Sequence, residues 1–283
     1  MGTLYVVATP IGNLNDMTKR AIETLKEVDI ILCEDTRTSM KLLNNFNIKN
    51  KLMSYHKYNE QEQTKNIIKL LKQDKNIAII TDAGTPCISD PGYILVKEAR
   101  ENNITVIPIG GISALITALS ASGIETDKFT FQGFFPRETK EKTKLLEELN
   151  KTTIKVHIFY ESPKRIIKTL EYLKNNLEIE KISIFKELTK LHEKNYYGSL
   201  EEVLNKLQNE EKTNQGEYTF IIKTKQKQEK EQNISLEALI IDKLIKEQKT
   251  IKEIVEILNK ENKNISKKDL YNASLNLKQI LKK

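Results

Sequence analysis

The sequence predicts an α/β protein made of two α/β subdomains and a small C-terminal helical module. Short apolar runs alternate with helical patterns through the first 222 residues, which is typical of sheets covered by helices. Clusters of Gly, Pro, Asp and Ser follow several of these runs, where the loops of such a sheet bind ligands. At 283 residues the chain is long enough for more than one core, because single cores stop growing at about 250 to 300 residues.

The first subdomain is expected to span residues 1–115 and to hold a parallel sheet. Its strands are the apolar runs at residues 3–9, 29–34, 76–82 and 104–109. Helices are expected where apolar residues recur every three or four positions, at residues 16–28, 59–73 and 93–102. A helix of small residues at 113–122 follows, and Gly123 ends it.

The second subdomain is expected to span residues 116–224. Its strands are the apolar runs at residues 128–134, 153–162, 181–188 and 217–224. Helical patterns separate them at residues 142–150, 163–175 and 199–208. The closing strands are expected to be more antiparallel than those of the first subdomain.

A linker is expected at residues 225–233, because this polar stretch has no apolar periodicity. Residues 234–283 are expected to form a basic module of three short helices that resembles a helix-turn-helix. Two helix starts fit the capping-box pattern, Thr250 with Glu253 and Ser266 with Asp269. The buried stripe of the middle helix is expected to comprise Ile251, Ile254, Val255 and Leu258.

The net charge of +7 is concentrated near the C-terminus. Residues 223–283 hold 15 lysines against 9 Asp and Glu, an excess of 6. A basic tail on a nearly neutral body favours contact with nucleic-acid phosphates. The alternative is a solvated charged face, since the whole chain is rich in Lys.

The composition and the lack of a membrane helix or leader pattern predict a cytoplasmic protein that binds no metal. No run approaches the roughly 20 consecutive apolar residues of a membrane helix, and the N-terminus lacks a basic leader. Neither the cysteines nor the histidines have metal-site or redox spacing, at Cys33, Cys87, His56, His157 and His192.

Four turn-rich segments are expected at the carboxyl ends of strands, where α/β sheets bind ligands. They are ATPIGNLND (8–16), CEDTRTS (33–39), AIITDAGTPCISDPGY (78–93) and PIGGISA (108–114). None has the Gly-rich run followed by Lys and Ser or Thr of a phosphate loop, or the glycine spacing of a dinucleotide site. The loops therefore favour a small polar ligand without a polyphosphate.

Seven segments together resemble the ribosomal RNA 2′-O-methyltransferase branch of the tetrapyrrole methylase superfamily. In chain order they are GTLYVVATPIGNL, CEDTRTS, DAGTPCISDPG, GISA, FYESPKRI, ELTKLHE and GEY, and they span residues 2 to about 222. The resemblance implies S-adenosyl-L-methionine in a cleft between the two subdomains, in a homodimer. It implies as acceptor the ribose 2′-hydroxyl of a cytidine in the decoding region of 16S rRNA, in the small ribosomal subunit.

The resemblance also implies cofactor contacts by position. These are Pro10, Ala83, Gly84, Thr85, Ile88, Ser113, Ala114, Leu188, Glu217 and Tyr218. The last two lie where the superfamily contacts the adenine side. The family usually has Pro-Gly-Pro at 110–112, Ser at 81 and His at 164, where this chain has Gly110-Gly111-Ile112, Thr81 and Lys164. The first departure loosens a loop that the family keeps stiff, and it bears on cofactor affinity.

Methyl transfer to a hydroxyl gains most from positioning, and a general base assists it. Candidate bases at strand ends are Glu34, Asp35, Asp82, Glu161 and Glu187. We favour Asp35, Arg37 and Glu161 as the catalytic residues that handle the acceptor. The alternative for each carboxylate is an ion pair that holds a loop, such as Asp35 with Arg37, and for Asp82 a turn cap.

Substrate-RNA contacts are expected from His56, Lys164, Arg165 and Lys190. The three cations can neutralise phosphates. The ring of His56, with Tyr55 and Tyr58 beside it, can stack on a splayed base, and packing in the core is the alternative for Tyr55.

Two other functions remain open on the sequence alone. A tetrapyrrole methylase would share the cofactor cleft, but CEDTRTS and YESPKR resemble the RNA branch. A non-enzymatic RNA-binding or ribosome-assembly factor would keep the fold, but the intact glycine loops favour an enzyme. Binding of S-adenosylmethionine separates this last class from the enzymes.

Overall fold

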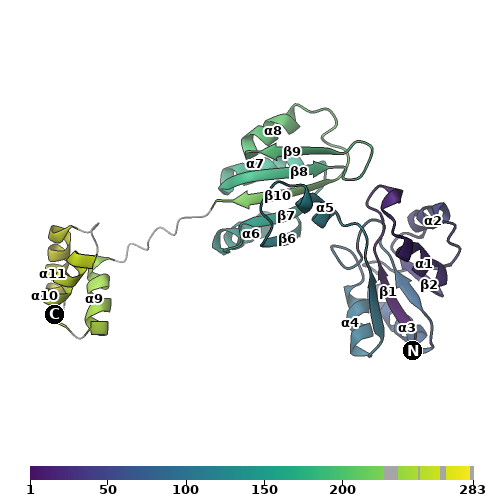
Figure 1. The fold of residues 1–283 in the computed structure, drawn as a ribbon, viewed down its shortest axis with the longest axis horizontal. Coiled ribbons are helices and arrows are strands. Elements are labelled where there is room, and N and C mark those ends of the chain that lie inside the picture. The colour runs from purple at the N-terminus through teal and green to yellow at the C-terminus, as the bar shows by residue number, and fades with distance from the viewer. Residues whose placement is uncertain (226–234, 248, 262–265, 281–283) are drawn as a thin grey trace. The chain divides into compact units, whose positions relative to one another are not determined.

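The computed structural model describes residues 1–225, 235–247, 249–261 and 266–280 (Figure 1). Residues 1–225 form one unit, and the residues from 226 onward form a second. The linker expected at 225–233 lies outside the described residues except for Lys225.

The first unit begins with a sheet of five strands in the order β3-β2-β4-β1-β5. All neighbouring strands are parallel, which confirms the predicted parallel sheet. The strands are β1 Thr3–Val7, β2 Ile30–Cys33, β3 Lys51–Ser54, β4 Ile77–Ile79 and β5 Thr105–Ile109. The edge strand β3 was not predicted, because none of its four residues is fully buried and its apolar run is short.

Helices cover both faces of this sheet. They are α1 Lys19–Glu27, α2 Thr36–Asn45, α3 Glu60–Lys72 and α4 Tyr93–Glu101, with a short 3-10 helix η1 at Leu14–Asp16. Residues of α1 and α2 pack with Ile31, whereas residues of α3 and α4 pack with Leu32 on the opposite face. Helix α2 was not predicted, because its polar sequence buries only Ser39 and Leu43.

The second sheet also has five strands, in the order β6-β7-β10-β8-β9. They are β6 Phe129–Phe134, β7 Val156–Glu161, β8 Ile179–Lys186, β9 Lys194–Gly198 and β10 Tyr218–Thr224. Strands β6 and β7 are parallel and the other neighbours are antiparallel, as predicted for the closing strands. Strand β9 was not predicted, because its residues are mostly exposed at the sheet edge.

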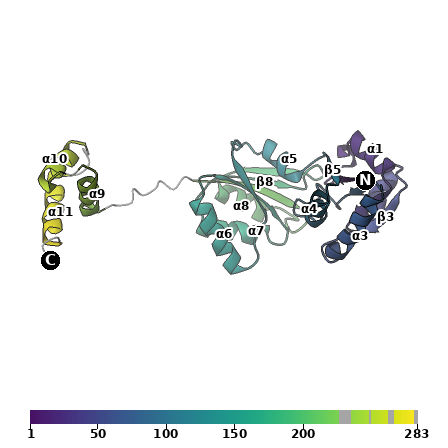
Figure 2. The ribbon, with the colours of Figure 1, turned by 90° about the horizontal axis from the view of Figure 1, so that it is seen from below.

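Helices also cover both faces of the second sheet (Figure 2). They are α5 Ala114–Ser120, α6 Thr139–Lys151, α7 Ile166–Asn176 and α8 Leu200–Gln208. Residues of α6, α7 and α8 pack with Phe159 and Phe220, whereas α5 packs with Ile158 and Ile221 on the other face. The division expected after residue 115 falls within α5, whose buried residues belong to the second sheet.

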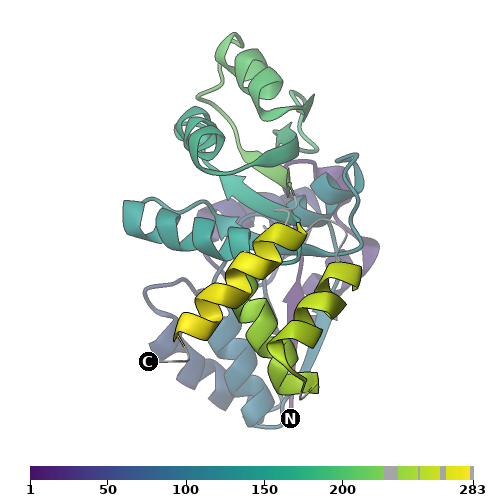
Figure 3. The same cartoon turned by 90° about the vertical axis from the view of Figure 1, so that its left-hand side faces the viewer.

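The second unit contains α9 Leu236–Glu247, α10 Ile251–Glu261 and α11 Lys267–Ile280, drawn in yellow-green to yellow in Figure 3. These helices share a core that includes Ile240, Ile254 and Leu270. The predicted capping box at Thr250 and Glu253 is present, because each side chain bonds the other's backbone amide. The hydroxyl of Ser266 accepts the amide of Asp269 at 3.1 Å. The helix starts are therefore set by local sequence.

Candidate functional site

A cavity of about 470 Å³ lies where loops from both sheets of the first unit meet. Its walls come from the loops after β1, β4 and β7, from the start of α5 and from the start of β10. The volume falls within the roughly 300 to 1,000 Å³ of small-molecule sites. The cavity is therefore large enough for a ligand of nucleoside size.

The turn-rich loop after β4 forms one wall of the cavity. The amide of Thr9 donates to the Gly84 carbonyl at 2.8 Å, and the Gly84 amide donates back at 3.2 Å. Gly84 has a φ of 92°, and Cys87 and Ser89 have φ values of 71° and 65°. Left-handed backbone conformations cost most residues conformational free energy, and glycine adopts them with the least strain. The two backbone hydrogen bonds tie this loop to the loop after β1.

Nine residues expected to act in the site line this cavity. They are Ala83, Gly84, Thr85, Ile88, Ser113, Ala114, Glu161, Glu217 and Tyr218. Two more lie behind its wall. Pro10 is buried directly before the lining residue Ile11, and Leu188 packs with Phe185 and Leu119.

Other lining residues were not assigned to the cofactor from the sequence. They are Ile11, Thr81, Asp82, Ser89, Asp90, Phe134, Tyr160, Ser162, Pro163 and Thr219. Ser89 and Asp90 directly follow Ile88, so the turn-rich segment itself was the available signal. Tyr160 carries no such signal, because its place in the cavity follows from the pairing of β7 with β10, where it lies opposite Thr219.

The lining of the cavity is acidic. It includes Asp82, Asp90, Glu161 and Glu217, and none of its residues, all within 1–225, is Lys, Arg or His. Glu161 and Glu217 are ion-paired with Arg165 and Lys190 behind the lining, so Asp82 and Asp90 supply the charge that faces the cavity. A carboxylate-lined pocket favours a cationic ligand and disfavours a polyphosphate. This charge agrees with the missing phosphate-loop sequence.

Asp90 has the most perturbed carboxyl pKa of the lining. Burial raises the pKa of Asp90 from its ordinary 3.8 to about 6, and the nearby charges of Glu34 and Asp82 add to this, while a hydrogen bond from Thr81 opposes it. Burial also raises the pKa values of Asp82 and Glu34. Such a group in a cavity is a candidate for proton transfer, because its pKa lies close to neutral pH.

Asp35 and Arg37, both expected to be catalytic, do not line the cavity. Asp35 caps α2: its Oδ1 accepts the Arg37 amide at 2.8 Å, and its Oδ2 lies 2.9 Å from the guanidinium. These hydrogen bonds from Arg37 lower the pKa of Asp35 to about 2. The Asp35 amide also lies 3.4 Å from Oδ1 of Asp82. The pair therefore holds the start of α2 beside the cavity.

Glu161 lines the cavity, but its carboxylate is engaged. Its side chain is fully buried, with Oε1 accepting the Ser162 amide and Oε2 the Thr169 hydroxyl, each at 2.7 Å. Arg165 forms an ion pair with it and also donates to the Phe135 carbonyl at 3.2 Å. Arg165 is thus committed inside the fold, whereas Lys164 is exposed.

Lys190, expected to contact RNA, links loops of the two sheets. Its ammonium lies 2.9 Å from Glu187 and 2.8 Å from Glu217. Burial lowers its pKa, but these two hydrogen bonds outweigh that effect and raise the pKa overall. The aliphatic part of the Lys190 side chain packs directly against Gly12. A Cβ on residue 12 would lie 2.4 Å from Cγ of Lys190. The lysine therefore joins the first loop to the cavity wall at Glu217.

His56 lies in the loop after β3, close to Tyr58. The two ring centroids are 6.1 Å apart in an edge-to-face arrangement. Tyr58 is 95% exposed, whereas Tyr55 is buried and its hydroxyl lies 3.0 Å from that of Thr64. Core packing is therefore the role of Tyr55, and only Tyr58 of these tyrosines has a ring face open to a partner.

Metal and membrane features were searched over the described ranges. Within residues 1–225, 235–247, 249–261 and 266–280, no group of three or more His, Cys, Asp or Glu side chains is arranged to hold a metal ion. None of the helices in these ranges is long and apolar enough to cross a membrane.

Gly110 and Gly111 in the loop before α5 make a matched pair for testing. A Cβ at Gly110 would meet nothing within 4 Å, whereas one at Gly111 would lie 2.9 Å from Cβ of Ala8. We expect Gly110→Ala to raise the free energy of unfolding by about 0.4 to 1 kcal/mol, because it restricts the unfolded chain. Gly111→Ala is expected to lower it by about 1 to 3 kcal/mol through overpacking. Urea denaturation measures both, and equal effects would contradict this geometry.

Comparisons with known proteins found a matching family and relatives that are named methyltransferases. Residues 3–204 match the model of the family described as Tetrapyrrole (Corrin/Porphyrin) Methylases. A protein of Halalkalibacterium halodurans called ribosomal RNA small subunit methyltransferase I is 49% identical over 221 residues, covering 78% of this chain and 75% of the relative. A Haemophilus influenzae protein of the same name is 42% identical over 258 residues, covering 91% of each chain.

A solved structure supports the fold. The uroporphyrin-III-C-methyltransferase of Thermus thermophilus superposes with a TM-score of 0.55 and covers 79% of this chain and 94% of its own. Its sequence identity is 15%, so the likeness concerns the fold alone.

Proposed function

This chain belongs to the tetrapyrrole methylase family, among the relatives called ribosomal RNA small subunit methyltransferase I, and from that premise we propose its reaction. It transfers a methyl group from S-adenosylmethionine to the ribose 2′-hydroxyl of a cytidine in the decoding region of 16S rRNA. We infer the RNA substrate from the Haemophilus influenzae relative, which is 42% identical to this chain over 91% of both chains. The description of the family favours a competing tetrapyrrole substrate. The 15% identical structure supports the fold alone.

The chemistry of the cavity fits this cofactor. Acidic side chains, Asp82 and Asp90 among them, suit a cation, and the lining holds no basic group that would serve a polyphosphate. Gly84 has a left-handed backbone conformation, and its missing Cβ leaves space for a ligand at the cavity wall. A Cβ at this position would fill that space and stand 3.5 Å from Ile11. When bound, S-adenosylmethionine supplies an electrophilic methyl group on a positively charged sulfur. Ala83, Gly84 and Thr85 would hold one side of it, and Glu217 and Tyr218 the adenine side.

We assign the proton acceptor to Asp90. A carboxylate oxygen of Asp90 accepts the proton that leaves the ribose hydroxyl as that oxygen gains its methyl group. Its raised pKa makes it a better acceptor than an ordinary aspartate near neutral pH. Asp35 and Glu161 are less suited, because their oxygens are already held by Arg37 and by Thr169 and Arg165. We assign these residues to positioning the walls of the site.

Exposed groups beside the cavity suit the RNA. The Arg37 side chain is 87% exposed, and Lys164 is also exposed. These cations can contact phosphates, and the open ring of Tyr58 beside His56 can stack on an unpaired base. Lys190 and Arg165, which are tied to carboxylates, act on the RNA only through the walls that they hold.

Tyr58→Ala tests the stacking surface. We expect it to weaken binding to a decoding-region RNA by about 5-fold to 100-fold, which corresponds to the loss of one base stacked on an aromatic ring. The affinity for S-adenosylmethionine should stay unchanged, because Tyr58 does not line the cavity. Tyr197→Ala, at a tyrosine 50% exposed on β9, is the matched control. Equal RNA affinities of the two variants would exclude this stacking role.

The proposed reaction is tested with small ribosomal subunits from a strain that lacks the protein. Tritiated methyl transfer followed by mapping of the modified ribose should place the label on a 2′-oxygen. Gly84→Val serves as the inactive control, because its side chain would narrow the cavity at a left-handed position. Label in a base, or transfer to a tetrapyrrole instead, would require another substrate.

We propose that the enzyme acts as a homodimer on the small subunit or its rRNA in the cytoplasm, where that substrate is found. Calorimetric titration with S-adenosylmethionine separates the enzyme from a non-enzymatic assembly factor. Absence of binding would favour the assembly factor.

A further inference from the structure

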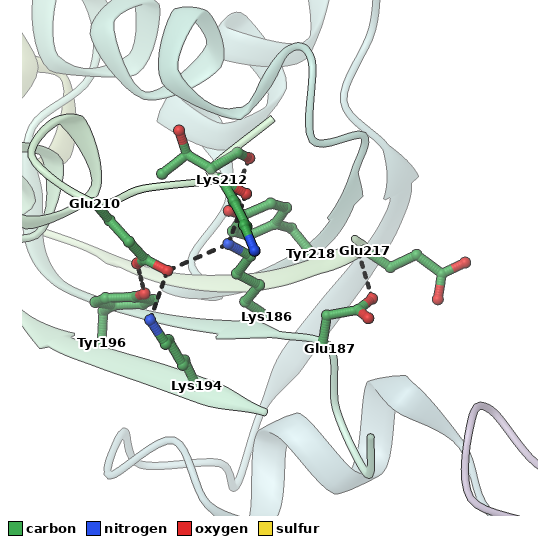
Figure 4. Close-up of polar contacts among 9 residues, drawn as sticks. Lys186, Glu187, Lys194, Tyr196, Glu210, Lys212, Glu217 and Tyr218 are labelled. Carbon is green, nitrogen blue, oxygen red and sulfur yellow. Dashed lines mark hydrogen bonds and ion pairs between the residues drawn. The ribbon is translucent and has the colours of Figure 1, made fainter. Parts of the chain in front are cut away.

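A buried lysine lies behind the cavity wall formed by β10. Lys186 ends β8 and is 7% exposed. Its ammonium donates to the Lys212 carbonyl at 2.9 Å and lies 3.2 Å from Oε1 of Glu210 (Figure 4). The same ammonium lies 5.7 Å from the ring centroid of Tyr218, a residue of the cavity lining.

Glu210 is the centre of this cluster. Its side chain is 12% exposed, and it accepts hydrogen bonds from Lys186, from Lys194 at 2.9 Å and from the hydroxyl of Tyr196. Burial raises the pKa of Glu210, but the hydrogen bonds from the two lysines outweigh it and lower the pKa overall. Glu210 is therefore a carboxylate that is ionised and fully paired.

The segment between Glu210 and Tyr218 is held by hydrogen bonds near both of its ends. The Tyr218 hydroxyl donates to the Thr213 carbonyl at 3.0 Å. The Glu217 amide donates to Oε1 of Glu187 at 3.0 Å. Since Lys186 already holds the Lys212 carbonyl, the segment is fixed at Lys212 and Thr213 near its start and at Glu217 near its end. Glu217 and Tyr218, which follow this segment, are therefore held in one position in the cavity wall.

Burying an ion pair gains little stability. Removing two charges from water costs several kcal/mol per ion, and apolar residues of similar volume often give an equally stable fold. The pair instead fixes the positions of its neighbours, because an ammonium group has three hydrogen-bond donors that orient the groups around it. Neither Lys186 nor Glu210 lines the cavity, so they act through the residues they hold.

We propose that Lys186 and Glu210 are a positioning pair that holds residues 210–217 against the second sheet and thereby sets Tyr218 in the cofactor cavity. As far as the ligand is S-adenosylmethionine, this rests on the proposed function. The ammonium of Lys186 supports the segment at Lys212 and the Tyr218 ring at once. Loosening the pair lets the adenine side of the cavity widen.

The test compares Lys186→Met and Glu210→Gln with a matched control, Lys194→Met. Lys194 contacts the same oxygen of Glu210 as Lys186 does, but its side chain is 53% exposed. We expect the two buried variants to raise the Kd for S-adenosylmethionine by about tenfold, a loss of about 1.4 kcal/mol, and the control to change it less than about twofold. Hydrogen exchange of the Gln215 and Glu217 amides should become faster in the buried variants only.

Three outcomes decide the proposal. Unchanged Kd and exchange in folded Lys186→Met and Glu210→Gln would overturn it, as would an equal loss in Lys194→Met. Should either buried variant not fold, Tyr196→Phe removes one hydrogen bond to Glu210 and should show the same change at smaller size; unchanged exchange there would overturn it. If the wild-type chain bound no S-adenosylmethionine, the proposed function would fail, and the exchange rates would still decide the pair.

Discussion

Asp90→Asn is expected to lower kcat for methyl transfer by about a hundredfold to ten-thousandfold, the usual contribution of a positioned proton acceptor. The amide keeps the shape of the side chain but cannot accept the hydroxyl proton. In the wild-type protein, kcat should rise as the pH increases through about 6, because the Asp90 carboxylate must be deprotonated to act.

Asp127→Asn is the control for this experiment, because Asp127 is exposed and does not line the cavity. A kcat for Asp90→Asn within tenfold of the control would exclude Asp90 as the acceptor. A pH profile that is flat between 5 and 7 would exclude it as well.

The same substitution should stabilise the fold. Because the folded-state pKa of Asp90, about 6, lies above its ordinary 3.8, folding takes up a proton between these pH values. The resulting destabilisation is absent below about pH 4 and complete above about pH 6. Asp90→Asn removes it, so unfolding at pH 7 should cost about 1 to 2 kcal/mol more, after allowance for solvent screening. Loss of rate with a gain in stability is not expected from damaged packing.

Glu161→Ala is expected to lower the free energy of unfolding by about 3 kcal/mol, the usual effect of leaving one member of a buried ion pair alone. Arg165, whose side chain is 24% exposed, would lose its carboxylate, and the Thr169 hydroxyl would lose its acceptor. Urea denaturation measures the loss. Adding Arg165→Leu should recover part of it, since no unpaired charge then remains.

Glu201→Ala is the control for Glu161, because its ion pair with Lys174 has side chains 68% and 44% exposed. This substitution should leave the unfolding transition near that of the wild type. If Glu161→Ala behaved in the same way, the buried network would contribute nothing to stability, and Glu161 would again be free for catalysis.

Local patterns in the sequence predicted most of the fold. Strands β1, β2, β4 and β5 of the first sheet and the antiparallel closing strands of the second were recognisable, because their apolar residues form short runs. The edge strands β3 and β9 and the polar helix α2 were missed, since each buries few apolar residues. Their formation depends on neighbours supplied by the rest of the sheet.

The sequence by itself predicted three of the loops that line the cavity, at residues 8–16, 78–93 and 108–114, whereas no residue of the fourth predicted loop, 33–39, lines it. Gly84, Gly92 and the short polar residues between them are conformational requirements of a turn, and such requirements can be read from neighbouring residues. The family resemblance rests on the same segments, and the family match confirms it.

Only the tertiary structure decided what surrounds each charged group. Asp35 and Glu161 are ion-paired, with Arg37 and Arg165, whereas Asp90 has a hydrogen bond with Thr81 and lies near the charges of Glu34 and Asp82. Lys190 finds its partner Glu217 27 residues away. The pair of Asp35 with Arg37 was already an alternative in the sequence, because the two residues are close in the chain. The pairing of Lys190 with Glu217 depends on a distance between remote residues, which no periodicity or motif records.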